Sequence, residues 1–113
     1  MINILEKIIQ EKKETLKIIK KDNSLSFLEN KIKTINTFLN FKDAILNNKK
    51  VSIISEIKKA SPSAGILVKN FNHLDIAKMY IDNGATCLSV LSEEKFFLGK
   101  LDYIKDIKDN FKI

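Results

Sequence analysis

A carboxylate and an ammonium group stand two residues apart in the middle of the chain. Residues 51–57 form a compact β-branched run that predicts a buried strand, and Glu56 and Lys58 lie at its C-terminal end. Side chains two apart on a strand point to the same side, so both groups are expected to face one small space and could share proton transfers. A structural ion pair at the strand end explains the same spacing, and both interpretations stay open.

The residues that follow predict a polar loop. Ser61 and Ser63 flank Pro62 within residues 60–65, and their hydroxyls could donate hydrogen bonds to an anionic group. Serine and proline are also ordinary turn residues, which explains the segment without any ligand.

Two aromatic residues occupy a second loop. Phe96 and Phe97 lie among charged residues and before Gly99, beyond the point where a second strand, residues 85–91, is expected to end. One ring could stack against a flat substrate, or both could cover the core. Two other candidates indicate little chemistry: His73 has no neighbouring metal ligand and reads as a capping or surface residue, and Cys87 reads as an inert buried thiol.

These residues must be positioned by alternating strands and helices. Periodic apolar residues predict a helix in the first twenty residues, and Ser26 with Glu29 has capping-box spacing for a second one. A third short helix is predicted over residues 41–46. Asn72 can cap a helix that Gly84 ends, and another helix covers residues 101–109. Residues 111–113 predict the onset of a third strand, so the order is that of a parallel α/β sheet.

Composition excludes several classes of protein. The chain has 113 residues, is 44% hydrophobic and 30% charged, and carries a formal charge of +6, all its basic residues being Lys. Residues 1–50 carry eleven Lys against six acids, and residues 51–113 nine against eight. The lack of Arg disfavours nucleic-acid recognition, no apolar run reaches membrane-spanning length, and a single cysteine fits a reducing cytoplasm. We therefore expect a cytoplasmic location with no nucleic-acid or membrane partner.

Two long motifs carry a resemblance to a known family. Residues 54–63, ISEIKKASPS, and residues 88–99, LSVLSEEKFFLG, are similar to the first and second barrel strands, with their loops, of indole-3-glycerol-phosphate synthases. Residues 4–9 resemble the extra N-terminal helix of that family, and residues 76–85 resemble its first barrel helix. The similarity spans essentially the whole chain.

The resemblance implies a fold, a reaction and roles for four residues. The family ring-closes and decarboxylates 1-(2-carboxyphenylamino)-1-deoxyribulose 5-phosphate to indole-3-glycerol phosphate in tryptophan biosynthesis, without metal or organic cofactor. By position, Lys58 and Glu56 match catalytic residues, whereas Ser61 and Phe97 match residues that bind the phosphorylated small-molecule substrate. The implied fold is α/β: an N-terminal helical extension, residues 1–50, and the first two β/α units and third-strand onset of an incomplete (β/α)8 TIM barrel, residues 51–113.

Length sets the remaining expectation. A complete barrel of this kind usually takes about 250 residues, so we expect this chain to be a fragment that is inactive by itself. Two alternatives stay open: a half-barrel interaction piece that pairs with a complementary chain supplying the missing C-terminal portion of the barrel, or a basic anion-binding module.

Overall fold

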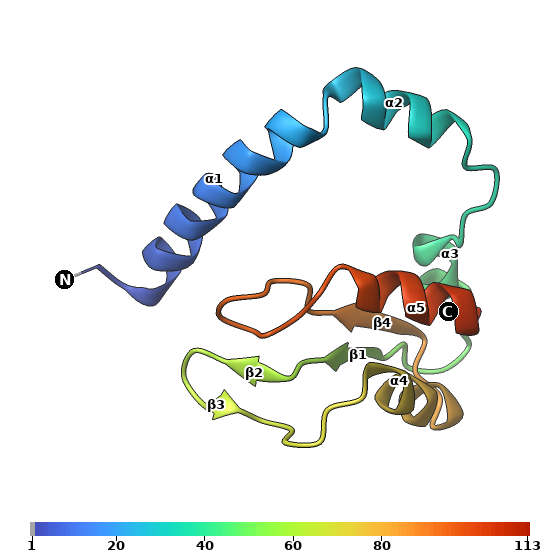
Figure 1. Ribbon diagram of the computed structural model, residues 1–113. Helices are drawn as coiled ribbons and strands as arrows, with labels where there is room; N and C mark the ends of the chain where they lie inside the picture. Colours follow the sequence, from blue (N-terminus) through green and yellow to red (C-terminus); the bar gives the residue numbers. More distant parts are fainter. Residues whose placement is uncertain (1) are drawn as a thin grey trace. The chain divides into compact units, whose positions relative to one another are not determined.

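The computed structural model describes residues 2–113, and these fall into two compact units that meet in sequence between Phe38 and Leu39. The first unit contains the helices α1 (Ile4–Asp22) and α2 (Leu25–Lys33). The second unit contains α3 (Phe41–Leu46), β1 (Ile54–Ile57), β2 (Ala60–Ser61), β3 (Gly65–Ile66), α4 (His73–Asp82), β4 (Cys87–Val90) and α5 (Asp102–Asn110), labelled in Figure 1. The division predicted from the sequence at residue 50 stays a prediction, although α3 clusters with the residues that follow it.

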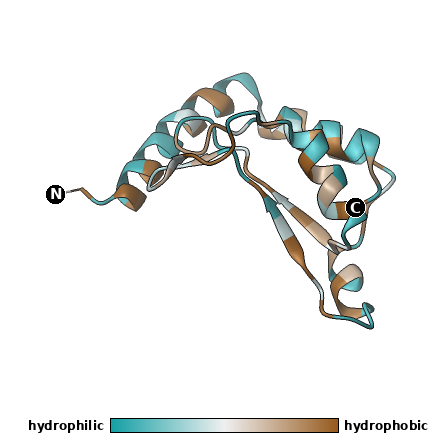
Figure 2. Ribbon diagram, turned by 90° about the horizontal axis from the view of Figure 1, so that it is seen from below, coloured by the Kyte–Doolittle hydropathy of each residue, from teal (hydrophilic) through white to brown (hydrophobic). Residues whose placement is uncertain are grey.

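Helix α1 begins with a reciprocal cap. The Asn3 side chain accepts a hydrogen bond from the Glu6 N–H at 2.8 Å, and the Glu6 carboxylate accepts one from the Asn3 N–H at 3.0 Å. This arrangement satisfies two backbone donors that a helix start leaves without partners. The apolar stripe of α1 is uncovered within its unit, since neither α1 nor α2 has a buried residue; Figure 2 shows its apolar positions interspersed among hydrophilic ones.

The prediction that Ser26 caps α2 is wrong. The cap is Ser24, whose hydroxyl accepts a hydrogen bond from the Phe27 N–H at 3.2 Å. Ser26 lies inside the first turn, with its hydroxyl 3.1 Å from that of Ser24. The helix therefore starts two residues earlier than the capping-box spacing of Ser26 and Glu29 indicates, because Ser24 offers an equivalent oxygen just after the end of α1.

The second unit is built on two parallel strands. Strand β1 pairs with β4, with Ile54 opposite Cys87 and Glu56 opposite Ser89. Helix α4 connects them, and Figures 1 and 2 both show the strands side by side. The parallel strand–helix–strand order predicted from the sequence is confirmed for this pair.

Strand β1 is shorter than the predicted residues 51–57. Before Ile54 the pairing is irregular: the Ile53 carbonyl still accepts from the Thr86 N–H at 2.8 Å, but the Ile53 N–H donates to the Thr86 hydroxyl at 3.0 Å, and the Ser52 hydroxyl donates to the Ile45 carbonyl at 3.0 Å. Val51 is largely exposed. The β-branched run therefore extends beyond the part that pairs regularly.

A small core lies on one face of the sheet. Ile57 of β1, Ala77 of α4 and Ile107 of α5 are buried together, with exposed fractions of 1%, 0% and 3%. Partly buried apolar residues surround them: Phe71, Leu74, Ile76, Tyr80, Leu88, Val90, Phe111 and Ile113. Because side chains alternate along a strand, Ile54 and Glu56 belong to the other face, where Ile54 is 51% exposed. Helices α4 and α5 thus cover one face of the sheet.

Local signals at the ends of α4 behave as predicted. The Asn72 side chain accepts hydrogen bonds from the N–H groups of Leu74 and Asp75 at 3.0 and 3.3 Å. Gly84 follows the helix with a φ of +90°, in the left-handed region that glycine adopts without strain.

The C-terminal residues follow α5 in extended conformation. Phe111 has φ −136° and ψ 149°, but residues 111–113 form no strand in the described chain. Phe111 and Ile113 instead pack against the core. The onset of a third strand at residues 111–113 therefore stays a prediction. The extended backbone of Phe111 is compatible with it.

Candidate active site

The predicted acid–base pair meets at the end of β1. The Nζ of Lys58 lies 2.8 Å from Oε1 of Glu56, and their side chains are 33% and 46% exposed. The prediction that the two side chains point to the same side is confirmed. An ion pair this exposed contributes only about 0–1 kcal/mol to stability, so its main consequence is to hold two groups of opposite charge within reach of solvent and solutes.

Neighbouring elements fix the backbone beneath this pair. The Tyr80 hydroxyl of α4 donates to the Glu56 carbonyl at 3.1 Å, and the Leu91 N–H donates to the Ile57 carbonyl at 3.2 Å. The strand end is therefore tied both to the helix behind the sheet and to β4. The pair lies on the sheet face away from α4 and α5, at the carboxyl end of the strands, where parallel α/β sheets bind ligands.

The loop after β1 contains a short hairpin that the sequence did not predict. Ala60 pairs with Ile66 and Ser61 with Gly65 as β2 and β3, and Gly65 reverses the chain at a φ of +66°. The Ser61 hydroxyl accepts a hydrogen bond from the Ala64 N–H at 3.2 Å and lies 3.4 Å from the Ser63 hydroxyl. Ser61 thus has the turn role that was one of its two interpretations, while its hydroxyl keeps a proton that it can donate.

The loop after β4, residues 93–99, is closed by its own first residue. The Glu93 carboxylate accepts hydrogen bonds from the N–H groups of Phe96 and Phe97 at 2.7 and 3.1 Å, and the Glu93 carbonyl accepts one from Gly99 at 2.7 Å. Phe97 is half-buried. Because β1 and β4 are adjacent and parallel, this loop and the Glu56–Lys58 pair leave the sheet at the same edge.

Gly99 makes that closure sterically demanding. A Cβ on Gly99 would lie 2.0 Å from the Leu91 carbonyl oxygen, closer than real contacts allow. Leu98, just before it, has a φ of 52°, which is uncommon for a residue other than glycine. The role of Glu93 in this loop was not predicted from the sequence; a glutamate three residues after the strand and six residues before a glycine was the available signal.

His73 and Cys87 serve the fold. Nε2 of His73 lies 2.9 Å from Oδ2 of Asp106, and its ring stacks on Tyr103 with centroids 4.3 Å apart, which joins α4 to α5. Asn72, not His73, is the helix cap. Cys87 is a buried free thiol. Within residues 2–113, no group of three His, Cys, Asp or Glu side chains is arranged to hold a metal ion.

Comparison with known proteins identifies the family to which this chain belongs. The family model for indole-3-glycerol phosphate synthase matches residues 5–113. The chain belongs to the indole-3-glycerol phosphate synthase family. The resemblance seen in the two strand-and-loop motifs is thereby confirmed, and the family's TIM-barrel fold agrees with the parallel β1–α4–β4 unit.

Named relatives extend along nearly all of this chain. An indole-3-glycerol phosphate synthase of Desulforamulus reducens is 45% identical over 105 residues, 93% of this chain and 40% of the relative. Proteins of the same name from Aliarcobacter butzleri and Trichodesmium erythraeum are 43% and 37% identical, covering 95% and 96% of this chain. The chain spans about two fifths of the length of these relatives.

The comparisons leave the individual roles of the four site residues as predictions: Glu56, Lys58, Ser61 and Phe97. The structure brings Glu56 and Lys58 into contact and places the Ser61 and Phe97 loops after adjacent strands. In the described part of the chain, no helix is both long and apolar enough to cross a membrane.

Proposed function

We propose that this chain forms the first β/α units of an enzyme that converts 1-(2-carboxyphenylamino)-1-deoxyribulose 5-phosphate to indole-3-glycerol phosphate, carbon dioxide and water. The observation that carries the proposal is the Glu56–Lys58 pair, which is solvent-accessible at the carboxyl end of β1 on the face that α4 and α5 leave open. Membership of the family supports the same reaction.

The chemistry needs groups of these kinds. Ring closure joins a carbon of the aryl ring to the ketone carbon of the sugar chain, and the ketone oxygen must take up a proton as the bond forms. Carbon dioxide then leaves from the same ring carbon, and its bonding electrons restore the aromatic ring. The new hydroxyl takes up a second proton and leaves as water, while the carbon beside the ring nitrogen loses a proton to a base, which forms the double bond of the indole. Lys58 is suited to stabilise the substrate carboxylate and to supply a proton, and Glu56 to hold Lys58 and to exchange protons with it.

The two loops supply binding groups in this proposal. The Ser61 hydroxyl donates a hydrogen bond to the substrate, and the Phe97 ring packs against the aryl ring. No metal or organic cofactor takes part. The substrate is a phosphorylated small molecule, and neither nucleic acid nor membrane is a partner; the enzyme acts in the cytoplasm.

Genetic complementation tests this function. The test uses the whole product of the gene that encodes residues 1–113, not these residues expressed alone. This product is expressed in bacteria that lack indole-3-glycerol-phosphate synthase and are grown without tryptophan. We expect growth with the wild type and with Lys59→Gln, the adjacent residue with the same loss of charge, but not with Lys58→Gln. Growth failure of the wild type despite soluble expression, or equal growth of both variants, would contradict the proposal.

A second proposal concerns what completes the barrel. Ile54 is half-exposed on the open face, and β1 and β4 are the only strands of their sheet in the described residues. Residues 1–113 expressed alone are therefore expected to be inactive, and further strands, in the same polypeptide or in a complementary chain, to restore turnover. Co-expression with the C-terminal three fifths of the Desulforamulus reducens relative tests this; activity of residues 1–113 alone would refute it.

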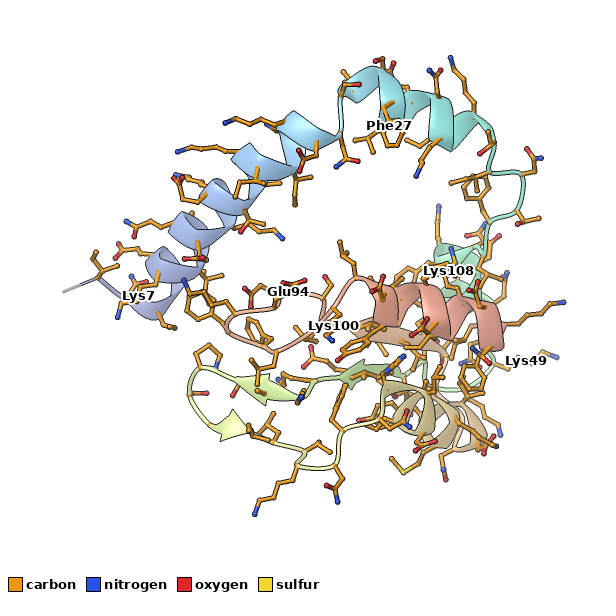
Figure 3. The ribbon with its side chains drawn as sticks, in the orientation of Figure 1. Lys7, Phe27, Lys49, Glu94, Lys100 and Lys108 are labelled. Atoms are coloured by element: carbon orange, nitrogen blue, oxygen red, sulfur yellow. The ribbon has the colours of Figure 1, made fainter. Side chains whose placement is uncertain are left out.

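The basic anion-binding module has weaker support. The net positive charge lies mainly in residues 1–50, where lysines such as Lys7, labelled in Figure 3, are exposed on the helices. Steeply salt-dependent binding of DNA or anionic vesicles by the wild type would favour it over the enzyme.

A further inference from the structure

Three consecutive backbone N–H groups converge on one carboxylate in the loop after β4. Oε2 of Glu93 accepts from Phe96 and Phe97, and Oε1 accepts from the Lys95 N–H at 3.0 Å. Loop N–H groups usually bond to water or to scattered partners, so this convergence means that one side chain determines the path of the loop. Hydrogen bonds to an ionised carboxylate are roughly twice as strong as neutral ones.

The far end of the same loop is held by backbone contacts that do not involve the Glu93 side chain. The Gly99 N–H donates to the Glu93 carbonyl at 2.7 Å, and the Gly99 Cα region fits closely against the backbone of Leu91. Leu98 adopts its left-handed φ of 52° between these two attachments. The Glu93 carboxylate therefore holds residues 95–97, and the Glu93 backbone carbonyl holds the far end of the loop at Gly99.

Phe97 lies inside this closed loop. Its N–H is one of the three donors to Glu93, so the position of its Cα depends directly on that carboxylate. The neighbouring Glu94 is exposed on the same loop, and Figure 3 shows it among the residues between β4 and α5. The two adjacent glutamates thus differ: the Glu93 carboxylate is bound to backbone N–H groups, and that of Glu94 is exposed.

We propose that Glu93 is a positioning residue, which holds Phe97 in place as one wall of the pocket for the substrate's aryl ring. This inference rests on the proposed function for the identity of the ring, but the loop clamp itself does not depend on it. Glu93 touches no reacting atom. Its effect is to fix the orientation of Phe97 before substrate arrives, so that binding does not have to order the loop.

Amide hydrogen exchange tests the clamp without any substrate. In the wild type, the Phe96 and Phe97 amides should be protected, and Glu93→Ala should accelerate their exchange by about tenfold or more. Glu93→Gln keeps the shape but loses the charge, so its acceleration should be intermediate. Glu94→Gln is the matched control and should leave both amides unchanged. Equal protection in Glu93→Ala and wild type overturns the inference.

Kinetics of the gene product containing this chain test the link to substrate. Glu93→Ala should raise KM for the carboxyphenylamino substrate by about tenfold while kcat changes by less than about threefold, because ground-state and transition-state binding of the ring weaken together. Added acetate, which can occupy the vacated N–H groups, should partly restore KM. A general loss of fold would lower kcat and would not respond to acetate, and that result refutes the positioning role.

The two proposals fail in different ways. If the wild type shows no turnover, the proposed function fails, and exchange at Phe96 and Phe97 still decides whether Glu93 clamps the loop. If the wild type is active and Glu93→Ala leaves both KM and exchange unchanged, the proposed function stands and the positioning role of Glu93 is wrong.

Discussion

Replacing Gly99 by alanine should destabilise the protein for a steric reason alone. The added Cβ would lie 2.0 Å from the Leu91 carbonyl oxygen and 2.6 Å from its carbon, where real Cβ atoms come no closer than 3.0 Å. Both atoms belong to backbone that cannot rotate away. The Gly99 backbone is not in the left-handed region, so conformational strain adds nothing.

The structure sets the size of this effect. Relief of the clash needs a shift of at least roughly 1 Å, which would stretch the 2.7 Å bond from the Gly99 N–H to the Glu93 carbonyl past hydrogen-bonding distance. Losing such a bond costs about 0.5–1.5 kcal/mol, and overpacking about 1–3 kcal/mol. Gly99→Ala should therefore lower the free energy of unfolding by about 2–4 kcal/mol.

Gly84 provides the matched comparison. A Cβ there meets no atom within 4 Å, but its φ of +90° strains any other residue. Gly84→Ala should thus cost only about 1–2 kcal/mol. Both variants are measured by urea denaturation of the same protein, followed by far-ultraviolet circular dichroism. A Gly99→Ala variant as stable as the wild type, or more stable than Gly84→Ala, would refute the reasoning.

Three further predictions concern single contacts. Asn72→Ala removes the α4 cap and should lower the free energy of unfolding by about 1 kcal/mol in the same denaturation assay; no change would argue against the cap. Tyr80→Phe removes the hydrogen bond to the Glu56 carbonyl and should cost about 1 kcal/mol, with faster amide exchange at the end of β1 as its signature. The hydrogen bond and attraction to Asp109 raise the pKa of Lys105 above its ordinary 10.5. The stabilisation from the Lys105–Asp109 pair is therefore complete below pH 10.5 and is lost as pH rises through the higher pKa of the folded state. Above pH 10.5, the helicity of α5 should fall more in the wild type than in Lys105→Gln. Identical pH profiles of helicity for the two proteins would contradict this.

Local rules were sufficient for much of the fold. The helix over residues 41–46 matches its prediction, and the caps of α4 at Asn72 and Gly84 were predictable because each depends only on neighbouring backbone. The Glu56–Lys58 contact followed from the alternation of side chains along a strand. These features need no knowledge of distant residues.

Other features depended on interactions that residue types do not specify. Ser24 and Ser26 are equivalent by type, and only the end of the preceding helix selects Ser24 as the cap. The β2–β3 hairpin requires the φ of Gly65, and the Glu93 clamp requires the backbone path through Leu98 and Gly99. The loops of the candidate site were therefore the least predictable part.

Direct measurement of product formation tests the central proposal most closely. The purified gene product containing this chain is mixed with the carboxyphenylamino substrate, and the fluorescence of the new indole is followed with time. We expect turnover by the wild type and by Lys59→Gln, and a rate lower by about 10²-fold or more for Lys58→Gln, the scale of a lost proton-transfer group. No indole from the wild type, or a Lys58→Gln rate within about threefold of it, would contradict the assignment of the Glu56–Lys58 pair as the acid–base centre.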